Sequence, residues 1–562
     1  MTDNFMFLLG FFSLCQIIFI PGIILLKLFK IKTTGLIQLL LYSFGLSLYC
    51  NYLIVCILTW LKLYTAPVIY LLFSIEVIYI VYLLIGYFYI NHSGKTVKDY
   101  YLLLKEYLTP FSLRYKIVFA LSFVTILFFL SLIPFSTGTS YYFIDAVNHW
   151  TRWPVQWASN IFPPGTRHYP QLFPANLSLI YVFTGEPGFQ FFPKAVMPFF
   201  FIGILLIYFD ISVYRKSIID LTSLIIYGFL LLIFYSVLFI LELNADIPVS
   251  FFSFLTFYAI IRNDQEGFNV ETILLIVVFA SSAALTKLAG LYILTLAGLW
   301  IIYVYYKNRK SISISTITRT IVYILLLLFG SIFWYLVRPA DMLQGLDQSI
   351  YLAPDYYTRF LSAVKMLFFT LGLPFFLFLL ITIIASLFSK QSRYIVILIV
   401  IPVLILWAFF FSADFRNLSL AVPFIAYTSG YGVWVIYNKI FRFRKVTDVP
   451  ISSEFFFKNK TLISWFVALS LLAAYSAFGT AIFFNFGIKF AYVFHNIFSG
   501  NYRLNYFSEI GYYRYFEYIV DALRLLCIVL FVLFIIKKAR LKISHILLFL
   551  FTIIMIAGFT IL

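Results

Sequence analysis

The side chains best suited to chemistry gather in residues 144–170, "IDAVNHWTRWPVQWASNIFPPGTRHYP", between two strongly apolar blocks. If this stretch is helical, Asp145, His149, Arg152 and Gln156 recur every three or four residues and share one face. A carboxylate there could accept a proton from a reacting hydroxyl group, and a cation could hold an anionic group. Asp145 could instead cap the helix, because Asp is a favoured N-cap residue.

Further charged side chains stand at the ends of apolar runs, far apart in the sequence. Asp246 lies in "NADIP", Lys287 in "ALTKLAG", Arg338 in "RPAD" and Arg416 in "FRNLSL". A lysine or arginine at such a position either holds an anion or extends towards water as a membrane anchor, and the sequence does not separate the two roles.

Metal and redox chemistry have little support in the sequence. His149 and His168 are more typical of hydrogen-bonding residues than of metal ligands, since no HxxxH pair or His–carboxylate cluster accompanies them. The four cysteines fall inside apolar runs and form no CxxC pair, which indicates neither disulfides nor a zinc site. A divalent cation is left open, and no other cofactor is expected.

The composition identifies the setting in which these side chains must work. Of 562 residues, 63% are hydrophobic, 22% are aromatic and only 11% are charged. Runs long enough to cross a membrane recur along the chain, and runs such as "TRTIVYILLLLFGSIFWYLV" are apolar on every face, unlike the alternating strands of a membrane barrel. The sequence therefore predicts an all-α, multi-pass membrane protein.

About sixteen membrane spans of roughly 17 to 25 residues are expected. They are placed at residues 5–27, 34–61, 65–90, 115–134, 193–213, 218–241, 247–261, 270–286, 288–306, 317–337, 362–388, 393–411, 416–438, 461–484, 516–536 and 543–562.

The net charge of +18 follows from topology and does not indicate a nucleic-acid partner. When the spans alternate in direction, about two thirds of the 40 Lys and Arg residues fall on one side, which the positive-inside rule assigns to the cytoplasm. The loops 135–192 and 485–515 then lie outside, together with the candidate site residues. We expect a plasma (inner) membrane protein whose site faces the external or periplasmic side.

Loop 135–192 is expected to lie along the outer membrane surface as two or three short helices without a full span. Its prolines interrupt every apolar run before the run reaches spanning length. The apolar face of its first helix would carry Val147, Trp150, Pro154, Trp157 and Ile161. Tryptophan suits the headgroup region, so this segment could cover a reaction on a lipid-borne substrate.

Several motifs, taken in order, resemble a known family. "DA" before the Trp-rich helix, then "HYPQLFP", "NADIPVSFF", "ALTKLAG" and "FRNLSLAVPFIA" are similar to the C-type (GT-C) superfamily of membrane glycosyltransferases, relatives of the protein mannosyltransferases and the lipid A aminoarabinose transferases. The resemblance covers roughly residues 115–440. It implies a GT-C-like helical core there, with additional transmembrane helices in residues 1–114 and 441–562.

The resemblance also implies a reaction. Members transfer a sugar, with inversion, from a polyprenyl-phosphate donor to an acceptor at the outer leaflet. Asp145 matches the general base and Asp246 the second external carboxylate, which could orient the acceptor, share a divalent cation or hold the covering segment. The expected substrate-binding residues are His149, Arg152, His168, Lys287, Arg338 and Arg416. The sugar and the acceptor, whether glycan, lipid or protein of the cell envelope, stay open.

Two positions depart from the family pattern: no acidic residue follows Lys287, and Asn417 stands where an aromatic residue is usual. Two other functions also stay open. A polymerase or ligase of lipid-linked glycans would share the large external loops. A flippase or transporter would more often place charges near the membrane midplane, where this sequence has few, and would more often contain an internal repeat. Glu76, inside the third expected span, is a polar residue that could face a helical neighbour.

Overall fold

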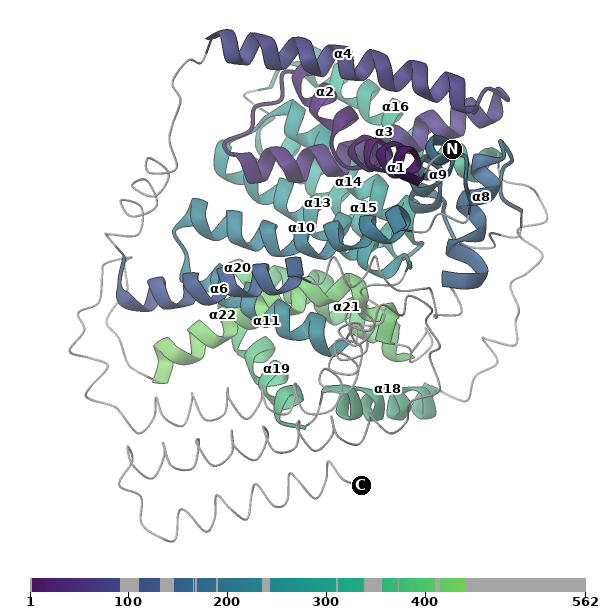
Figure 1. Ribbon diagram of the computed structural model, residues 1–562. Coiled ribbons are helices and arrows are strands. Elements are labelled where there is room, and N and C mark those ends of the chain that lie inside the picture. Colours follow the sequence, from purple (N-terminus) through teal and green to yellow (C-terminus); the bar gives the residue numbers. More distant parts are fainter. Residues whose placement is uncertain are drawn as a thin grey trace.

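The computed structural model describes residues 3–90, 111–131, 146–164, 166, 169–187, 191–234, 243–309, 312–337, 356–371, 373–409 and 415–440. These residues form helices and connecting turns, with no strand among them (Figure 1). Asp145, His168 and Arg338, the loop 485–515 and the region 441–562 lie outside the described residues, and so do the last three expected spans.

The helices in chain order are α1 (Asp3–Ile18), α2 (Ile20–Leu28), α3 (Leu36–Trp60), α4 (Ala66–Ile90), α6 (Leu113–Ser131), the π-turn η1 (Ala146–Trp150), α8 (Arg152–Ala158), α9 (Leu172–Thr184), α10 (Phe191–Arg215), α11 (Ile218–Phe234), α13 (Asp246–Glu266), α14 (Val270–Thr286), α15 (Gly290–Lys307), α16 (Ile314–Val337), α18 (Tyr356–Leu371), α19 (Leu373–Ser386), α20 (Lys390–Ile395), the π-turn η3 (Val396–Val400), α21 (Ile401–Phe409), the 3₁₀ helix η4 (Phe415–Ala421) and α22 (Val422–Ile440).

The predicted helical membrane class is confirmed. Within the described ranges, eight helical segments are long and apolar enough to cross a membrane. In the part of the chain that the structure describes, each expected span up to residue 438 overlaps a helix or consecutive helices. The first span is divided at Phe19, because Pro21 lies in the first turn of α2 and has no N–H to continue α1.

The centre of the bundle is built from α3, α10, α13 and α14, whose aromatic side chains interlock. The ring of Phe44 in α3 lies 5.0 Å from that of Phe200 in α10 and 5.1 Å from that of Phe251 in α13. Tyr42 lies 5.5 Å from Phe279 in α14. Helix α3, from the region expected to carry additional helices, thus belongs to the same hydrophobic core as residues 115–440. Helix α4 lies at the edge of the bundle (Figure 1).

Helices α10 and α13 run parallel, side by side. Gly203 packs on the ring of Phe251, where an added Cβ would lie 2.5 Å from a ring carbon. Seven residues further along each helix, the Tyr258 hydroxyl donates to Asp210 Oδ2 at 2.6 Å. The equal spacing fixes the register, so the first turns of both helices lie at the same end of the bundle.

Two ends of the bundle can therefore be distinguished. The Asp246 end holds the first turns of α10 and α13, and the Arg262 end holds their last turns. The α2–α3 connection lies at the Arg262 end, where Arg262 donates to the Thr34 hydroxyl at 2.9 Å. Lys62, in the α3–α4 connection, donates to the carbonyl of Asn160 at 3.3 Å.

Candidate functional site

The first turn of α13 is built by the sequence "NADIP". The Asn244 side-chain oxygen accepts hydrogen bonds from the backbone N–H groups of Asp246 and Ile247 at 2.9 and 3.4 Å. Pro248 has no N–H, and the N–H of Val249 is the first to bond within the helix. Because Asn244 caps the helix, the carboxylate of Asp246 is left for another partner.

That partner is Lys287, which the turn between α14 and α15 carries. Lys287 adopts an extended conformation as the C-cap of α14, and α15 begins three residues later at Gly290. A Cβ at Gly290 would lie 2.1 Å from the backbone of Ala283, so the close approach of the two helices requires glycine. The motif "TKLAG" therefore forms a tight reversal with Lys287 at its tip.

The third element is η4, which precedes α22. Pro423 in the first turn of α22 has no N–H, so the carbonyl of Ser419 lacks its usual helical donor. The hydroxyl of Ser250, one turn into α13, donates to that carbonyl and binds η4 to α13. This contact places Asn417 beside the start of α13.

The three motifs converge on one hydrogen-bonded cluster. Lys287 Nζ donates to Asp246 Oδ1 at 2.6 Å and to Asn417 Oδ1 at 2.9 Å. The side chain of Asp246 is 8% exposed and that of Lys287 is 18% exposed. An ammonium group carries three N–H donors, and among the described residues the third has no protein partner.

The geometry limits what each group can do. Lys287 Nζ occupies Oδ1 of Asp246 at 2.6 Å, so that oxygen is not open to a reacting hydroxyl group while the pair is closed. Lys287 is held in place, partly accessible and able to donate one more charge-assisted hydrogen bond. The cluster is therefore better suited to binding an anionic oxygen than to removing a proton.

The predicted amphipathic helix forms as two pieces, η1 and α8. Of the expected apolar face, Trp150, Pro154 and Trp157 are buried within the protein, whereas Ile161 is exposed, which the stripe did not predict. Arg152 is exposed, and Trp153, which was assigned to neither face, is buried. The break falls at Thr151, so that Pro154 lies in the first turn of α8. A proline is tolerated there because the N–H groups of a first turn have no helical acceptor.

An aromatic chain connects this Trp-rich segment (residues 146–158) to α13. His149 stacks on Trp153 at 5.1 Å, and Trp150 lies 6.0 Å from Phe173 in α9. Phe173 contacts Phe200 of α10 at 5.7 Å, and Phe200 lies 6.4 Å from Phe252, which follows Asp246 by six residues. The segment is thus continuous with the packing beneath the cluster.

Helix α9 differs from the expectation that loop 135–192 contains only helices on the membrane surface. All of its residues, Leu172–Thr184, are buried, so α9 lies inside the bundle, whereas an interfacial helix was expected to leave one face to the headgroups. The Asn176 amide donates to the carbonyls of Leu48 and Leu172, both at 2.8 Å. The Tyr64 hydroxyl shares a 2.7 Å hydrogen bond with Ser178, and burial raises the pKa of Tyr64, which keeps the phenol neutral. These polar contacts allow a short helix to be buried.

Of the predicted site residues, the structure brings Asp246 and Lys287 together directly. Arg416, next to Asn417 in η4, is half-buried and already engaged by the protein. His149 and Arg152 belong to the Trp-rich segment.

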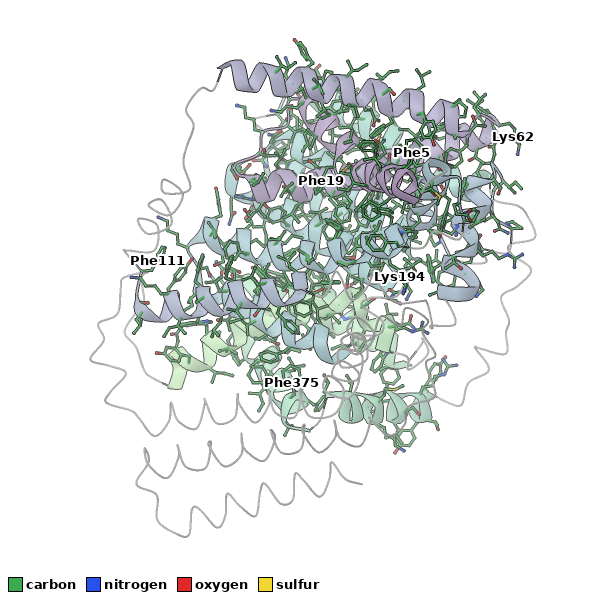
Figure 2. All side chains as sticks on the ribbon, viewed as in Figure 1. Phe5, Phe19, Lys62, Phe111, Lys194 and Phe375 are labelled. Atoms are coloured by element: carbon green, nitrogen blue, oxygen red, sulfur yellow. The ribbon has the colours of Figure 1, made fainter. Side chains whose placement is uncertain are left out.

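Two residues at the Asp246 end were not predicted as site residues. Asn417 was noted only as a departure from the family pattern. Lys194 is 1% exposed in the first turns of α10, and it is engaged by the protein. Figure 2 labels it within the outline of the molecule, whereas Lys62 lies at the edge. The α10–α13 register places Lys194 one turn beyond the level of Asp246, or about 6 Å. A lysine just inside an apolar span was the available signal.

A second charged cluster lies at the Arg262 end. Asp210 accepts from Tyr258 and from Arg262, at 2.6 and 2.8 Å, and the guanidinium of Arg262 stacks 4.1 Å above the Tyr214 ring. Its residues are mostly buried and hydrogen-bonded to one another, which is typical of a structural ion pair.

Glu76, unassigned from sequence, faces helical neighbours. It lies beside Gln16 of α1, which in turn donates to Asn51 of α3 at 3.3 Å. Within the described part of the chain, no group of three His, Cys, Asp or Glu side chains is arranged to hold a metal ion.

Comparisons with models of known protein families, with curated proteins and with solved structures find no match.

Proposed function

We propose that this protein is a membrane glycosyltransferase that takes a sugar from a polyprenyl-phosphate donor and transfers it to a cell-envelope acceptor. The observation that carries the proposal is the convergence of "NADIP", "TKLAG" and "FRNLSL" on one cluster. Lys287 is 41 residues from Asp246 and 130 residues from Asn417 in the sequence. Each of the three motifs is one of the ordered motifs on which the family resemblance is based.

The proposed roles follow from the chemistry of the transfer. The acceptor hydroxyl attacks the anomeric carbon, the bond from that carbon to the phosphate oxygen breaks, and the phosphate keeps the electron pair. A cation stabilises the departing phosphate, and Lys287 has an N–H group suited to that task. Asp145 would accept the proton of the acceptor, as the resemblance implies. Asp246 is unsuited to this role because Lys287 occupies it.

The proposed orientation places the Asp246 end outside. The Arg262 end carries Lys27 in the last turn of α2, Lys30 and Lys32 in the α2–α3 connection, and the end of α10 at Arg215. The positive-inside rule assigns such an end to the cytoplasm. The cluster would then meet donors in the outer leaflet, and the Trp-rich segment would cover it.

The test separates catalysis from helix capping at Asp145. Asp145→Asn keeps the ability to cap a helix but removes the proton-accepting carboxylate. We expect sugar transfer by purified, reconstituted protein to fall roughly 100-fold or more, with protein yield and membrane insertion unchanged. Near-normal transfer would show that another group accepts the proton. An absence of transfer by the unmodified protein across a panel of polyprenyl-phosphate sugars would contradict the proposed function.

A flippase for lipid-linked glycans is the second candidate. It is favoured by the ion pairs at both ends of α13, Asp246 with Lys287 and Asp210 with Arg262, which could open alternately. In that case reconstituted protein would move a labelled lipid-linked glycan between leaflets without transferring its sugar.

A further inference from the structure

We infer that Asn417 and Asp246 are positioning residues, which together aim the third N–H of Lys287 at an oxygen of a lipid phosphate. This inference rests on the proposed function, because it assigns the roles within the same cluster. It also gives a physical role to Asn417, the position at which the sequence departs from the family pattern.

A lysine side chain needs more than one partner to be directed. Lysine has a long, flexible stem and three equivalent donors, so an ammonium held by one partner can still rotate. Two acceptors on different elements, Asp246 on α13 and Asn417 on η4, lie 2.6 and 2.9 Å from Nζ. With two of its N–H groups directed, the direction of the third is also determined.

Both acceptors are held in place by contacts of their own elements. Asp246 lies in a first turn capped by Asn244, and its side chain is 8% exposed. Asn417 is held near α13 because Ser250 donates to the carbonyl of Ser419 in the same 3₁₀ turn. A side chain without an acceptor atom at position 417 would leave Lys287 with one of its two acceptors among the described residues.

The charges of the two acceptors affect how strongly Lys287 attracts an anion. Asp246 and Lys287 together carry no net charge, so the neighbouring carboxylate weakens the attraction of the ammonium for an anion. A neutral acceptor at position 417 adds direction without adding negative charge. The arrangement therefore favours orientation of the phosphate over tight binding, which suits a group that must leave with the polyprenyl chain after each turnover.

The two acceptors should respond in opposite directions to isosteric changes. Asp246→Asn removes a negative charge and keeps an oxygen acceptor at the same place. An anionic ligand should therefore bind with unchanged affinity or up to roughly 3-fold more tightly. Asn417→Asp retains an oxygen acceptor but adds a negative charge, so the same ligand should bind at least about 3-fold more weakly. Lys287→Gln removes the cation and should abolish phosphate-dependent binding. If both residues served only to hold the fold, both isosteric changes would weaken binding together.

The experiment measures binding of farnesyl phosphate to the full-length protein in detergent by calorimetry, with farnesol as the uncharged control. The expected result is phosphate-dependent binding, tightened or unchanged in Asp246→Asn, weakened in Asn417→Asp and lost in Lys287→Gln, with farnesol binding equal in all. Thermal unfolding in parallel identifies variants that fail to fold. Asn417→Ala, which in the transfer assay should lower kcat more than it raises KM for the donor, then replaces an unfolded Asn417→Asp.

The outcomes separate this inference from the proposed function. If Asp246→Asn and Asn417→Asp shift the affinity in the same direction, or if farnesol binds as tightly as farnesyl phosphate, the inference is overturned. Sugar transfer with unaltered kinetics in both variants would overturn it while the proposed function stands. If the affinities for farnesyl phosphate change in the expected directions but the protein transfers no sugar, the inference is supported and the proposed glycosyltransferase activity is contradicted.

Discussion

The polar residues at the Asp246 end lie at or next to the ends of helices. Asn244 caps α13, Lys287 ends α14 and Asn417 lies in the 3₁₀ turn before α22, so each polar group stands where backbone N–H or C=O groups also need partners. Lys287 forms an ion pair with Asp246 that is mostly buried. Such a pair contributes position more than stability, because the desolvation of the charges offsets much of their attraction.

The ion pair at the opposite end gives a prediction for stability. Arg262→Met would leave the buried carboxylate of Asp210 without its cation, at a cost of about 3 to 5 kcal/mol. The double variant Asp210→Asn with Arg262→Met should be less destabilised than Arg262→Met alone, since no uncompensated charge remains. Thermal unfolding in detergent measures both, with the exposed Glu271→Gln as the control. Equal midpoints for the wild-type protein and Arg262→Met would contradict a structural role.

At the scale of elements, the decisive features are close approaches that set where helices reverse. The α14–α15 turn brings the backbone at Gly290 against that of Ala283, and this contact fixes the place of Lys287 at the tip. The α10–α13 contact through Gly203 fixes the register that brings both first turns to one end. In a bundle made largely of Phe, Ile and Leu, such small residues determine which helices can come close.

A pair of glycines in α15 tests this view. Gly290→Ala should destabilise the protein by about 1 to 3 kcal/mol, because the new Cβ would lie 2.1 Å from backbone atoms that cannot rotate away. Gly298→Ala is the matched control, since a Cβ at Gly298 meets nothing within 4 Å. It should change stability by less than about 1 kcal/mol, in the stabilising direction. Similar unfolding midpoints for the two variants would mean that the turn adapts easily.

At the scale of the molecule, the two ends of the bundle differ in their polar chemistry. The Asp246 end has a cluster with one accessible cation, whereas the Arg262 end has a closed ion-pair network and the basic α2–α3 connection. If the Arg262 end faces the cytoplasm, Ser159 and Asp264 should lie on opposite sides of the membrane. Both side chains are exposed.

Cysteine labelling checks that orientation. In a background without native cysteines, Ser159→Cys should react with a membrane-impermeant maleimide on intact cells. Asp264→Cys should react only after permeabilisation. The reverse pattern would place the Asp246 end in the cytoplasm and exclude a donor from the outer leaflet.

Much of the architecture followed from local patterns. Apolar runs of spanning length predicted the helices, because a membrane requires every backbone polar group to be satisfied within the helix. The spacing of Trp150 and Trp157 predicted the buried face of the Trp-rich segment, and the prolines predicted its division. The motifs also marked Asp246 and Lys287 as candidates, although their contact could not be known from their positions in the sequence.

The class of the molecule can be predicted from local patterns, since hydropathy and helix periodicity are properties of neighbouring residues. The pairing of Lys287 with Asp246, the place of Asn417 in the cluster and the burial of α9 depend on how the helices pack. Those features depend on contacts between residues as far as 169 positions apart. They arise through the register of parallel helices and through the Ser250 hydroxyl, which donates to the Ser419 carbonyl that Pro423 cannot bond. Hydropathy also could not separate α9 from a surface helix, because a membrane and a protein core present the same apolar surroundings.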